Sequence, residues 1–194
     1  MQPALRRQTE GVASVFLYFA GDRLSESELW SARLDGHLVE LGEGFVPADT
    51  VETSALRAAS LAPITGTDAA ATHASAAWVH GLIDDPPCRH SIQRITATRT
   101  RQRIGRRFVY RDPLVPDRDL WIISGVAVTS PERTLADLAR SGEEDAERIV
   151  REIARTHPEL AAPAREWLRS CARMPNKRRA IGLLEACSGR GEGA

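Results

Sequence analysis

The chain is poor in lysine and cysteine, and both shortages limit the chemistry it can carry. Of its 26 basic side chains, 25 are arginine and one, Lys177, is lysine. A nuclease that pairs acids with a lysine on a strand is disfavoured, because Lys177 lies at the expected start of a helix. The three widely spaced cysteines fit neither a disulfide framework nor a repeated metal-knuckle spacing. We interpret them as reduced, small hydrophobic residues: Cys88, Cys171 and Cys187.

Long hydrophobic runs are also missing. No stretch approaches the ~18 consecutive apolar residues that span a bilayer. The amino terminus lacks the charged, apolar and small-residue regions of a secretory signal. We therefore expect a cytoplasmic protein without membrane association, and the 194 residues suffice for one compact domain or for a small and a medium one.

The formal net charge is zero, but its distribution is uneven. Residues 1–60 carry five arginines against nine acids, and residues 61–112 carry eight arginines against four acids. The remainder is balanced, with thirteen basic side chains, including Lys177, against thirteen acids. The middle of the chain is thus the basic part. Genomic base composition can contribute to the arginine excess, so arginine abundance alone is weak evidence for binding.

The first fifty residues predict two helices and a hairpin. The apolar run 12–20 ends at a Gly-Asp stop and predicts a buried helix. Ser25 offers a cap for a second helix over 26–34. Two short strands follow, over 37–41 and 45–46. Helix, helix and hairpin together resemble a reduced winged helix.

The middle of the chain mixes helices and strands, and the end is helical. The predicted elements of the middle are helices over 55–62 and 69–82, strands over 91–98 and 104–111, and a hairpin of 120–123 with 126–129 around Ser124-Gly125. Three apolar stripes after residue 145 predict three helices separated by prolines. The glycine-rich residues 188–194 are expected to be disordered.

Residues 126–139 form the most informative stretch, because they combine a strand end, a capped turn and an amphipathic helix. Ser130 can accept hydrogen bonds from the free amides of the first turn, and Pro131 suits the first helical position. Arg133 and Asp137 are four residues apart and can pair on the helix surface. Alternatively, this pair holds the helix against the hairpin of residues 120–129.

Two segments together resemble a known family. They are Ser75-Ala76-Ala77-Trp78-Val79-His80-Gly81-Leu82 and Val128-Thr129-Ser130-Pro131-Glu132-Arg133-Thr134-Leu135-Ala136-Asp137-Leu138-Ala139. Both are similar to the actinobacterial AbiEi-type antitoxins, here in a short form without a nuclease-like extension. The family-motif residues are then Ser75, Trp78, Gly81, Ser130, Pro131, Arg133 and Asp137.

The resemblance implies a non-enzymatic antitoxin and transcriptional regulator. In that family an amino-terminal winged helix binds DNA, usually the pair's own promoter region, and the partner is a nucleotidyltransferase-like toxin. A full winged helix places a recognition helix before the wing. Here Gly36 leads almost directly into the strand predicted over 37–41, which leaves no room for that helix. The alternative is a protein-interaction module that binds the toxin without binding DNA.

The arginines between Pro86 and Tyr110 are the candidate binding residues, because seven of them occur there without an acid. Alternation along a strand would place Arg99, Arg101 and Arg103 on one face. Guanidinium groups suit phosphates, an acidic patch on a toxin, or solvent in a turn between strands. The full candidate set for nucleic acid or an acidic partner is Arg99, Arg101, Arg103, Arg106, Arg107 and Arg33.

Other chemistry has weaker support. His73, His80, Cys88 and His90 lack a metal-ligand spacing, so we expect neither a metal nor a cofactor. Ser75 and His73 point apart on a helix, which argues against a hydrolase. Tryptophans in apolar stripes are expected to anchor the core or an interface: Trp30, Trp78, Trp121 and Trp167.

The sequence therefore predicts an α+β protein. A reduced winged-helix-like module, residues 1–50, precedes an antitoxin domain over 51–187 that has a short antiparallel sheet and carboxy-terminal helices. Residues 188–194 form a tail. No heptad pattern or apolar stripe fixes an oligomeric state.

Overall fold

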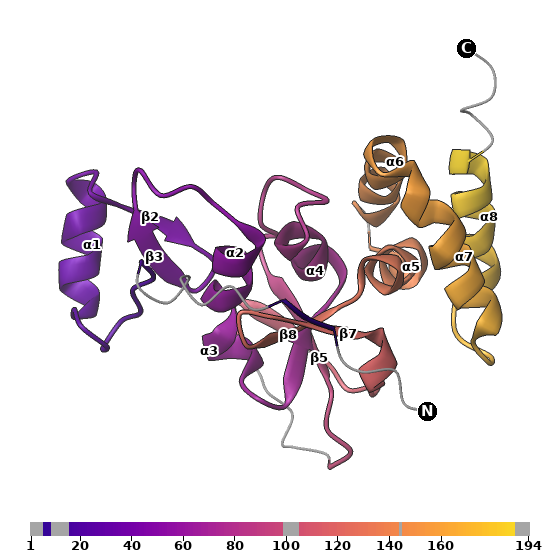
Figure 1. Cartoon of the computed structure of the whole chain (residues 1–194), viewed down its shortest axis with the longest axis horizontal. Helices are drawn as coiled ribbons and strands as arrows, with labels where there is room; N and C mark the ends of the chain where they lie inside the picture. Colours follow the sequence, from indigo (N-terminus) through magenta and orange to yellow (C-terminus); the bar gives the residue numbers. More distant parts are fainter. Residues whose placement is uncertain (1–5, 9–15, 99–104, 144, 189–194) are drawn as a thin grey trace.

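The computed structural model describes residues 6–8, 16–98, 105–143 and 145–188. It confirms an α+β protein with carboxy-terminal helices (Figure 1). The strands are β1 (Arg6–Gln8), β2 (Leu38–Leu41), β3 (Gly44–Pro47), β4 (Ala69–Ala71), β5 (His90–Arg94), β6 (Phe108–Arg111), β7 (Leu120–Ile123) and β8 (Val126–Thr129). The helices are α1 (Glu26–Leu34), α2 (Ser54–Ser60), α3 (Ala62–Thr65), α4 (His73–Val79), α5 (Pro131–Ser141), α6 (Ala146–Thr156), α7 (Ala161–Ser170) and α8 (Lys177–Ser188), with 3-10 turns η1 (Asp117–Asp119) and η2 (Pro158–Leu160).

Two sheets form in the described part of the chain. The larger one has six strands in the order β1-β7-β8-β4-β5-β6, and the smaller one pairs β2 with β3. The predicted hairpin is present as the antiparallel pair of β7 and β8, and β4 and β5 are also antiparallel. Parallel pairs join β1 to β7, β4 to β8 and β5 to β6. The larger sheet is thus mixed. Its strand β1 comes from the first residues of the chain.

The segment 69–72 is not helical, contrary to the prediction of one helix over 69–82. Ala69, Ala70 and Ala71 form β4, an inner strand between β8 and β5, and all three are fully buried. Alanine has weak strand propensity, but burial between two neighbouring strands outweighs it. The helix begins only at His73, after Thr72.

The hairpin β7–β8 and helix α5 follow the local signals in the sequence. Ser124 and Gly125 both have positive φ, 46° and 80°, as the two-residue hairpin turn requires. Ser130 accepts a hydrogen bond from the amide of Arg133, and Pro131 occupies the first helical position. Gly142 ends α5 in the left-handed conformation, with φ 71°.

The amino-terminal module differs from the prediction at its first element. Residues 16–20 are not helical: Tyr18 and Phe45 exchange two backbone hydrogen bonds of 2.9 Å, which adds an extended segment beside β3. Aromatic residues favour such an extended chain. Residues 12–15 of the predicted helix lie outside the described residues. The helix α1 and the hairpin β2–β3 form as predicted, with a capping box between Ser25 and Glu28.

Two main hydrophobic cores hold the molecule together. The first lies between the sheet and helices α2 and α4, and includes Trp78, Ile92 and Val128. The second lies among α5, α6, α7 and α8, and includes Leu135 and Leu168. Helix α4 contributes to both, since Ala77 packs into the second core. Figure 1 shows the resulting arrangement, with the α1 module at one end, the sheet in the middle and the four carboxy-terminal helices at the other end.

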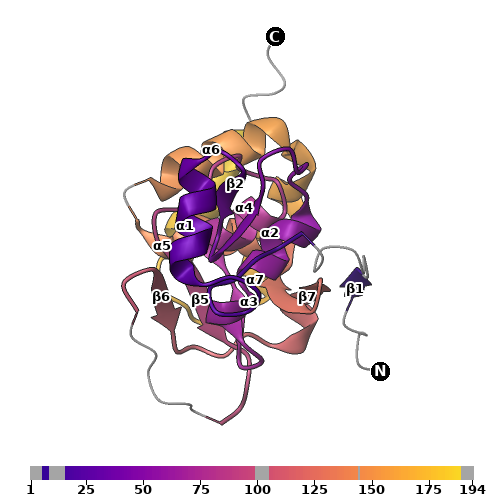
Figure 2. The ribbon, with the colours of Figure 1, turned by 90° about the vertical axis from the view of Figure 1, so that its left-hand side faces the viewer.

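Seen along the long axis, α1 stands in front of the central part (Figure 2). None of the helices in the described part of the chain has the length and hydrophobicity needed to cross a membrane.

Candidate functional site

The two family-like segments of the sequence lie against each other in the fold. The first segment, residues 75–82, runs through α4, and the second, residues 128–139, runs from β8 through α5. His80 Nε2 contacts the carbonyl oxygen of Thr129 at 2.7 Å, and the hydroxyls of Thr129 and Thr134 share a hydrogen bond of 2.7 Å. These contacts join the end of α4 to the start of α5, so the two segments form one structural unit.

Arg133 is the centre of a buried network of charged side chains. Its Nε donates to Asp137 Oδ2 and its Nη1 to Asp119 Oδ2, both at 2.7 Å. Asp119 Oδ1 accepts a hydrogen bond of 3.1 Å from Trp167 Nε1, and the guanidinium lies 4.3 Å from the centroid of that ring. Asp137 Oδ1 accepts from Arg140 at 3.0 Å. The network thus joins η1, α5 and α7.

This burial corrects the expectation that Arg133 faces water and pairs with Asp137 on the helix surface. Arg133 is 5% exposed and Asp137 is fully buried. The pair forms, but it also binds Asp119, the residue that precedes the β7–β8 hairpin. The physical reason is that α7 covers this face of α5, and Trp167 closes the site. The contacts are those expected of a pair that holds α5 against the hairpin.

Ser75 pairs with His90 and not with His73. Ser75 Oγ lies 3.1 Å from His90 Nδ1 and accepts the backbone N–H of Ser91 at 2.9 Å. His73 has a φ of 52° and shares a 3.0 Å hydrogen bond with the hydroxyl of Thr72. Ser75 is fully buried and engaged with the backbone, so its hydroxyl is placed to join α4 to β5 and not to attack a substrate.

Burial keeps the histidines of this region neutral. It lowers the pKa of His73 to about 4, although Asp137 acts in the opposite direction. It also lowers the pKa of His90 to about 4, with Arg107 adding to the effect. The pKa of His80 is lowered by burial against the opposing hydrogen bond to Thr129. A neutral ring can accept hydrogen bonds, which matches the Ser75–His90 contact.

Trp78 and Gly81 complete the first segment. Trp78 is fully buried, and its ring centroid is 5.8 Å from that of His90. The guanidinium of Arg57 lies over the Trp78 ring, 5.4 Å from its centroid. Arg57 also donates to the carbonyl oxygen of Trp78 at 2.8 Å, which joins α2 to α4. Gly81 follows the end of α4 with a φ of 73°, a conformation that favours glycine.

The predicted arginine stripe is described only in part. Arg99, Arg101 and Arg103 lie outside the described residues. Strand β5 ends at Arg94 and β6 begins at Phe108, so residues 95–98 and 105–107 are not strand as predicted. In the described part, the Arg94 guanidinium donates hydrogen bonds to the carbonyl oxygens of Thr96, at 2.6 Å, and of Asp112, at 2.9 Å.

The remaining candidate arginines lie near acidic residues of the amino-terminal module or are exposed. Arg107 Nε is 3.3 Å from Glu43, and Arg33 is 3.8 Å from Glu40. Burial raises the pKa of the Glu43 carboxyl against the opposing effect of Arg107. Arg106 is exposed. Arg33 and Arg107 are therefore partly neutralised, and Arg106 is the more available cation.

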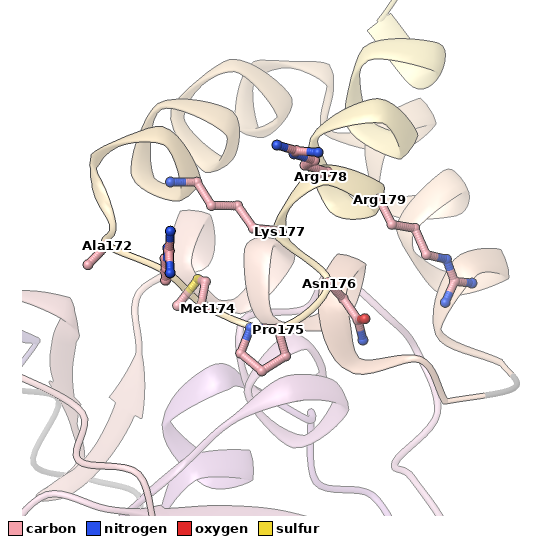
Figure 3. Close-up of a pocket in the computed structure, with 8 residues that line it drawn as sticks. Ala172, Met174, Pro175, Asn176, Lys177, Arg178 and Arg179 are labelled. Carbon is pink, nitrogen blue, oxygen red and sulfur yellow. The ribbon is translucent and has the colours of Figure 1, made fainter.

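A second basic surface, not predicted, lies where α7 turns into α8. Figure 3 shows a shallow groove there, of about 610 Å³, lined by residues 172–179. Lys177 Nζ is occupied with the carbonyl oxygens of Arg169 and Cys171, at 3.2 and 2.6 Å. Asn176, with a φ of 58°, donates to the carbonyl oxygen of Arg140. Arg173 and Arg178 are exposed.

Among the described residues, no group of three or more histidine, cysteine or acidic side chains is placed to hold a metal ion. Cys88 is exposed, and Cys171 and Cys187 are half-buried; all three are free thiols.

Comparison with known proteins identifies the family. The model of the AbiEi antitoxin C-terminal domain matches residues 69–182, which include both segments and the Arg133 network. The chain belongs to the AbiEi antitoxin family. The crystal structure of the RV2827C protein from Mycobacterium tuberculosis is similar with a TM-score of 0.45 and 20% identity, over 87% of this chain and 68% of that one. No curated protein matches the chain. Membership of the AbiEi family supports an antitoxin role and suggests that this role is not enzymatic.

Sequence reasoning did not single out Asp119, and it named His90 and Trp167 without predicting their partners in this unit. Asp119 and Trp167 are 14 and 48 residues from the groups they bind. The pattern of apolar residues around α5 could have indicated such partners, because a charged residue on an apolar helix face needs one. Nothing in the local sequence indicates which segment supplies that partner.

Proposed function

We propose that this AbiEi-family protein is a non-enzymatic antitoxin that binds the promoter region of its own operon and counteracts a nucleotidyltransferase-like toxin. The observation that carries the proposal is the family match over residues 69–182, within which both family-like segments pack into one unit. An antitoxin needs no catalytic group. The buried serine, histidines and charges of this unit all have structural partners, in keeping with that role.

Binding to DNA is proposed to use the arginines of residues 99–107. Phosphate contacts from arginine supply affinity, and that contribution falls as salt displaces it. Arg106 is exposed next to β6. With Arg99, Arg101 and Arg103 it would form a cationic segment without a neighbouring acid in the sequence.

The test is fluorescence anisotropy with DNA from upstream of the coding sequence, against a scrambled duplex, over a salt series. We expect tighter binding to the native duplex at near-physiological salt. Reversing Arg99, Arg101 and Arg103 to Glu should weaken binding by about tenfold or more and flatten the salt dependence. The matched control reverses three exposed arginines on α6: Arg148, Arg151 and Arg155. Unchanged affinity in the first triple variant would count against this segment.

A second candidate function is a protein-interaction module that binds the toxin without DNA. Two observations favour it. Residues 16–60 carry eight acids against three arginines, which opposes phosphate binding. The helix that precedes the hairpin, α1, also begins with Glu26 and Glu28. Co-purification with a nucleotidyltransferase-like toxin, together with no preference for the native duplex, would select this function over the first.

A further inference from the structure

Three exposed arginines lie at the start of strands β5 and β6. The two strands are parallel, with His90 opposite Phe108, so Arg89 and Arg107 precede neighbouring strands at the same end. The guanidinium of Arg89 reaches from the start of β5 to the start of β6, where it donates to the carbonyl oxygen of Phe108 at 3.0 Å. Arg106 comes directly before Arg107, and all three arginines are exposed. We call them the β5–β6 arginine cluster.

An acidic side chain of the amino-terminal module contacts this cluster. Glu43 lies in the turn between β2 and β3, and its Oε2 is 3.3 Å from Arg107 Nε. Arg107 also donates a hydrogen bond of 3.3 Å to the carbonyl oxygen of Gly42 in the same turn. Among the described residues, no other acid forms an ion pair with Arg89, Arg106 or Arg107. The turn of the small hairpin thus neutralises one member of the cluster and leaves the other two.

The two partners of this ion pair differ in their freedom to move. The backbone N–H of Glu43 donates to the carbonyl oxygen of Ser60, at the end of α2, at 3.2 Å. Gly42 packs so closely there that an added Cβ would lie 2.2 Å from Ser60 Oγ. The Glu43 side chain is 11% exposed, whereas that of Arg107 is 64% exposed. The carboxylate is therefore held in place, while the guanidinium can leave it and pair with another anion.

The position of Glu43 adds little stability to the fold. Its Oε1 is buried without a hydrogen-bond partner in the part of the chain that the structure describes, and such an acceptor costs free energy. Burial raises the pKa of the Glu43 carboxyl more than Arg107 lowers it. An ion pair with one largely exposed partner is also weak. The main effect of the Glu43 carboxylate is therefore on the charge that Arg107 offers to other anions.

We propose, on the basis of the DNA binding proposed above, that Glu43 competes with nucleic-acid phosphates for Arg107 and so lowers the affinity of the β5–β6 arginine cluster. A guanidinium pairs well with either a carboxylate or a phosphate, so Arg107 binds one or the other. Arg89 and Arg106 stay available to phosphates throughout. Phosphate contacts supply the sequence-independent part of DNA affinity. Glu43 thus weakens binding to any duplex and leaves sequence readout to other contacts.

The test is fluorescence anisotropy of the full chain with a scrambled duplex over a salt series, because the competition concerns phosphates and not bases. Glu43→Gln should tighten binding about threefold, the effect of releasing one weakly paired arginine. It should also steepen the dependence of log K on log salt by about 0.9, which corresponds to one added phosphate contact. The matched control is Asp49→Asn, which removes one exposed acid from the same module. It should change affinity much less.

A double-mutant cycle assigns the effect to its contact. In the natural background, Arg107→Gln should weaken binding less than Arg106→Gln, because Arg107 is already paired. In the Glu43→Gln background, Arg107→Gln should weaken binding about threefold and cancel the gain. Both arginines are exposed, so these variants should fold, and circular dichroism with thermal unfolding checks this.

Several results would overturn the proposal. Glu43→Gln that binds the scrambled duplex like the natural protein would show that Arg107 is not withheld. An equal gain in Asp49→Asn, or a gain that persists without Arg107, would show a general effect of negative charge. If no form of the protein binds any duplex at low salt, the DNA function and the competition fail together. Preference for the native duplex with no effect of Glu43 overturns the competition alone. A gain in Glu43→Gln without that preference supports the competition and counts against a sequence-reading regulator.

Discussion

Arg133 and Asp137 illustrate how single residues of the family-like segments act in this fold. Asp137 is fully buried between two arginines, Arg133 and Arg140, and accepts from each with a different oxygen. Buried charges cost free energy unless they are paired and hydrogen-bonded. The two carboxylates around Arg133 and the indole of Trp167 meet that condition, so we interpret these residues as the structural centre of the antitoxin domain.

Replacing Asp137 with Asn should lower the free energy of unfolding by about 3 kcal/mol, because Arg133 and Arg140 lose a buried carboxylate. Urea denaturation followed by circular dichroism measures this. Asp145→Asn is the matched control, since Asp145 pairs with Arg148 on the surface and both side chains are about three-quarters exposed. We expect no measurable change there. Similar losses in both variants would mean that the network does not stabilise the fold.

Stability should decrease as the pH falls from about 6.5 towards 4. The folded protein keeps His73 and His90 neutral because burial lowers the pKa of each to about 4, whereas the unfolded chain takes up protons near pH 6.5. Each histidine then contributes a slope of about 1.4 kcal/mol per pH unit in this window. Urea denaturation across the window measures the slope.

Two variants assign that slope to its source. His73→Asn suits the positive φ at this position, and His90→Gln keeps a polar group near Ser75. Each should give a shallower pH profile than the natural protein. Profiles parallel to that of the natural protein would show that neither ring is held neutral.

At the scale of elements, two helices with similar caps differ in position: α5 lies in the core of the molecule and α1 at its periphery. Ser130 caps α5, which packs against α4, α6, α7 and α8, and Ser25 caps α1 at the far end of the molecule. Both caps have the same chemistry. Their different positions should give them different thermodynamic effects.

Ser130→Ala should lower the global free energy of unfolding by about 1 kcal/mol, because the amide of Arg133 loses its partner beside a buried helix. Ser25→Ala should leave global unfolding nearly unchanged and speed hydrogen exchange within α1 only. Chemical denaturation and hydrogen-exchange mass spectrometry make the comparison. A global effect of equal size in both variants would contradict the separation of core and periphery.

Local signals predicted the elements that depend on a few adjacent residues. The cap and proline of α5, the Ser124-Gly125 turn and the stripes of the carboxy-terminal helices all formed as expected. The helices predicted over 12–20 and at the start of 69–82 were wrong, because the extended segment at Tyr18 and strand β4 each depend on a neighbouring strand that is distant in sequence. The partners of Arg133 in its buried network could not be predicted for the same reason, because they come from distant segments. The arginine stripe stays a prediction, since Arg99, Arg101 and Arg103 lie outside the described residues.

For the whole molecule, the balance of charge is the main electrostatic feature: residues 16–60 are net acidic, whereas residues 131–188 carry eleven basic and ten acidic side chains. The formal net charge is zero and the isoelectric point is about 7.0, so long-range repulsion between copies is minimal at neutral pH. Attraction between unlike charges on neighbouring copies then meets no net repulsion.

Solubility should therefore be lowest near pH 7, and moderate salt should raise it by screening the attraction. Static light scattering over pH and salt measures the net interaction between molecules. At pH 9 the interaction should become repulsive. If salt lowered solubility near pH 7, apolar contacts would dominate instead of charge.

The position of the single lysine has a practical consequence for following motion in the protein. Because Lys177 is the only lysine, a protease specific for lysine has one cleavage site in the whole chain. The Nζ of that residue donates hydrogen bonds to two carbonyl oxygens at the end of α7 and is therefore not free to enter the protease. Cleavage requires that α7 and α8 separate locally. The rate of that single cut thus reports how often the carboxy-terminal helix pair opens, without any label or engineered residue.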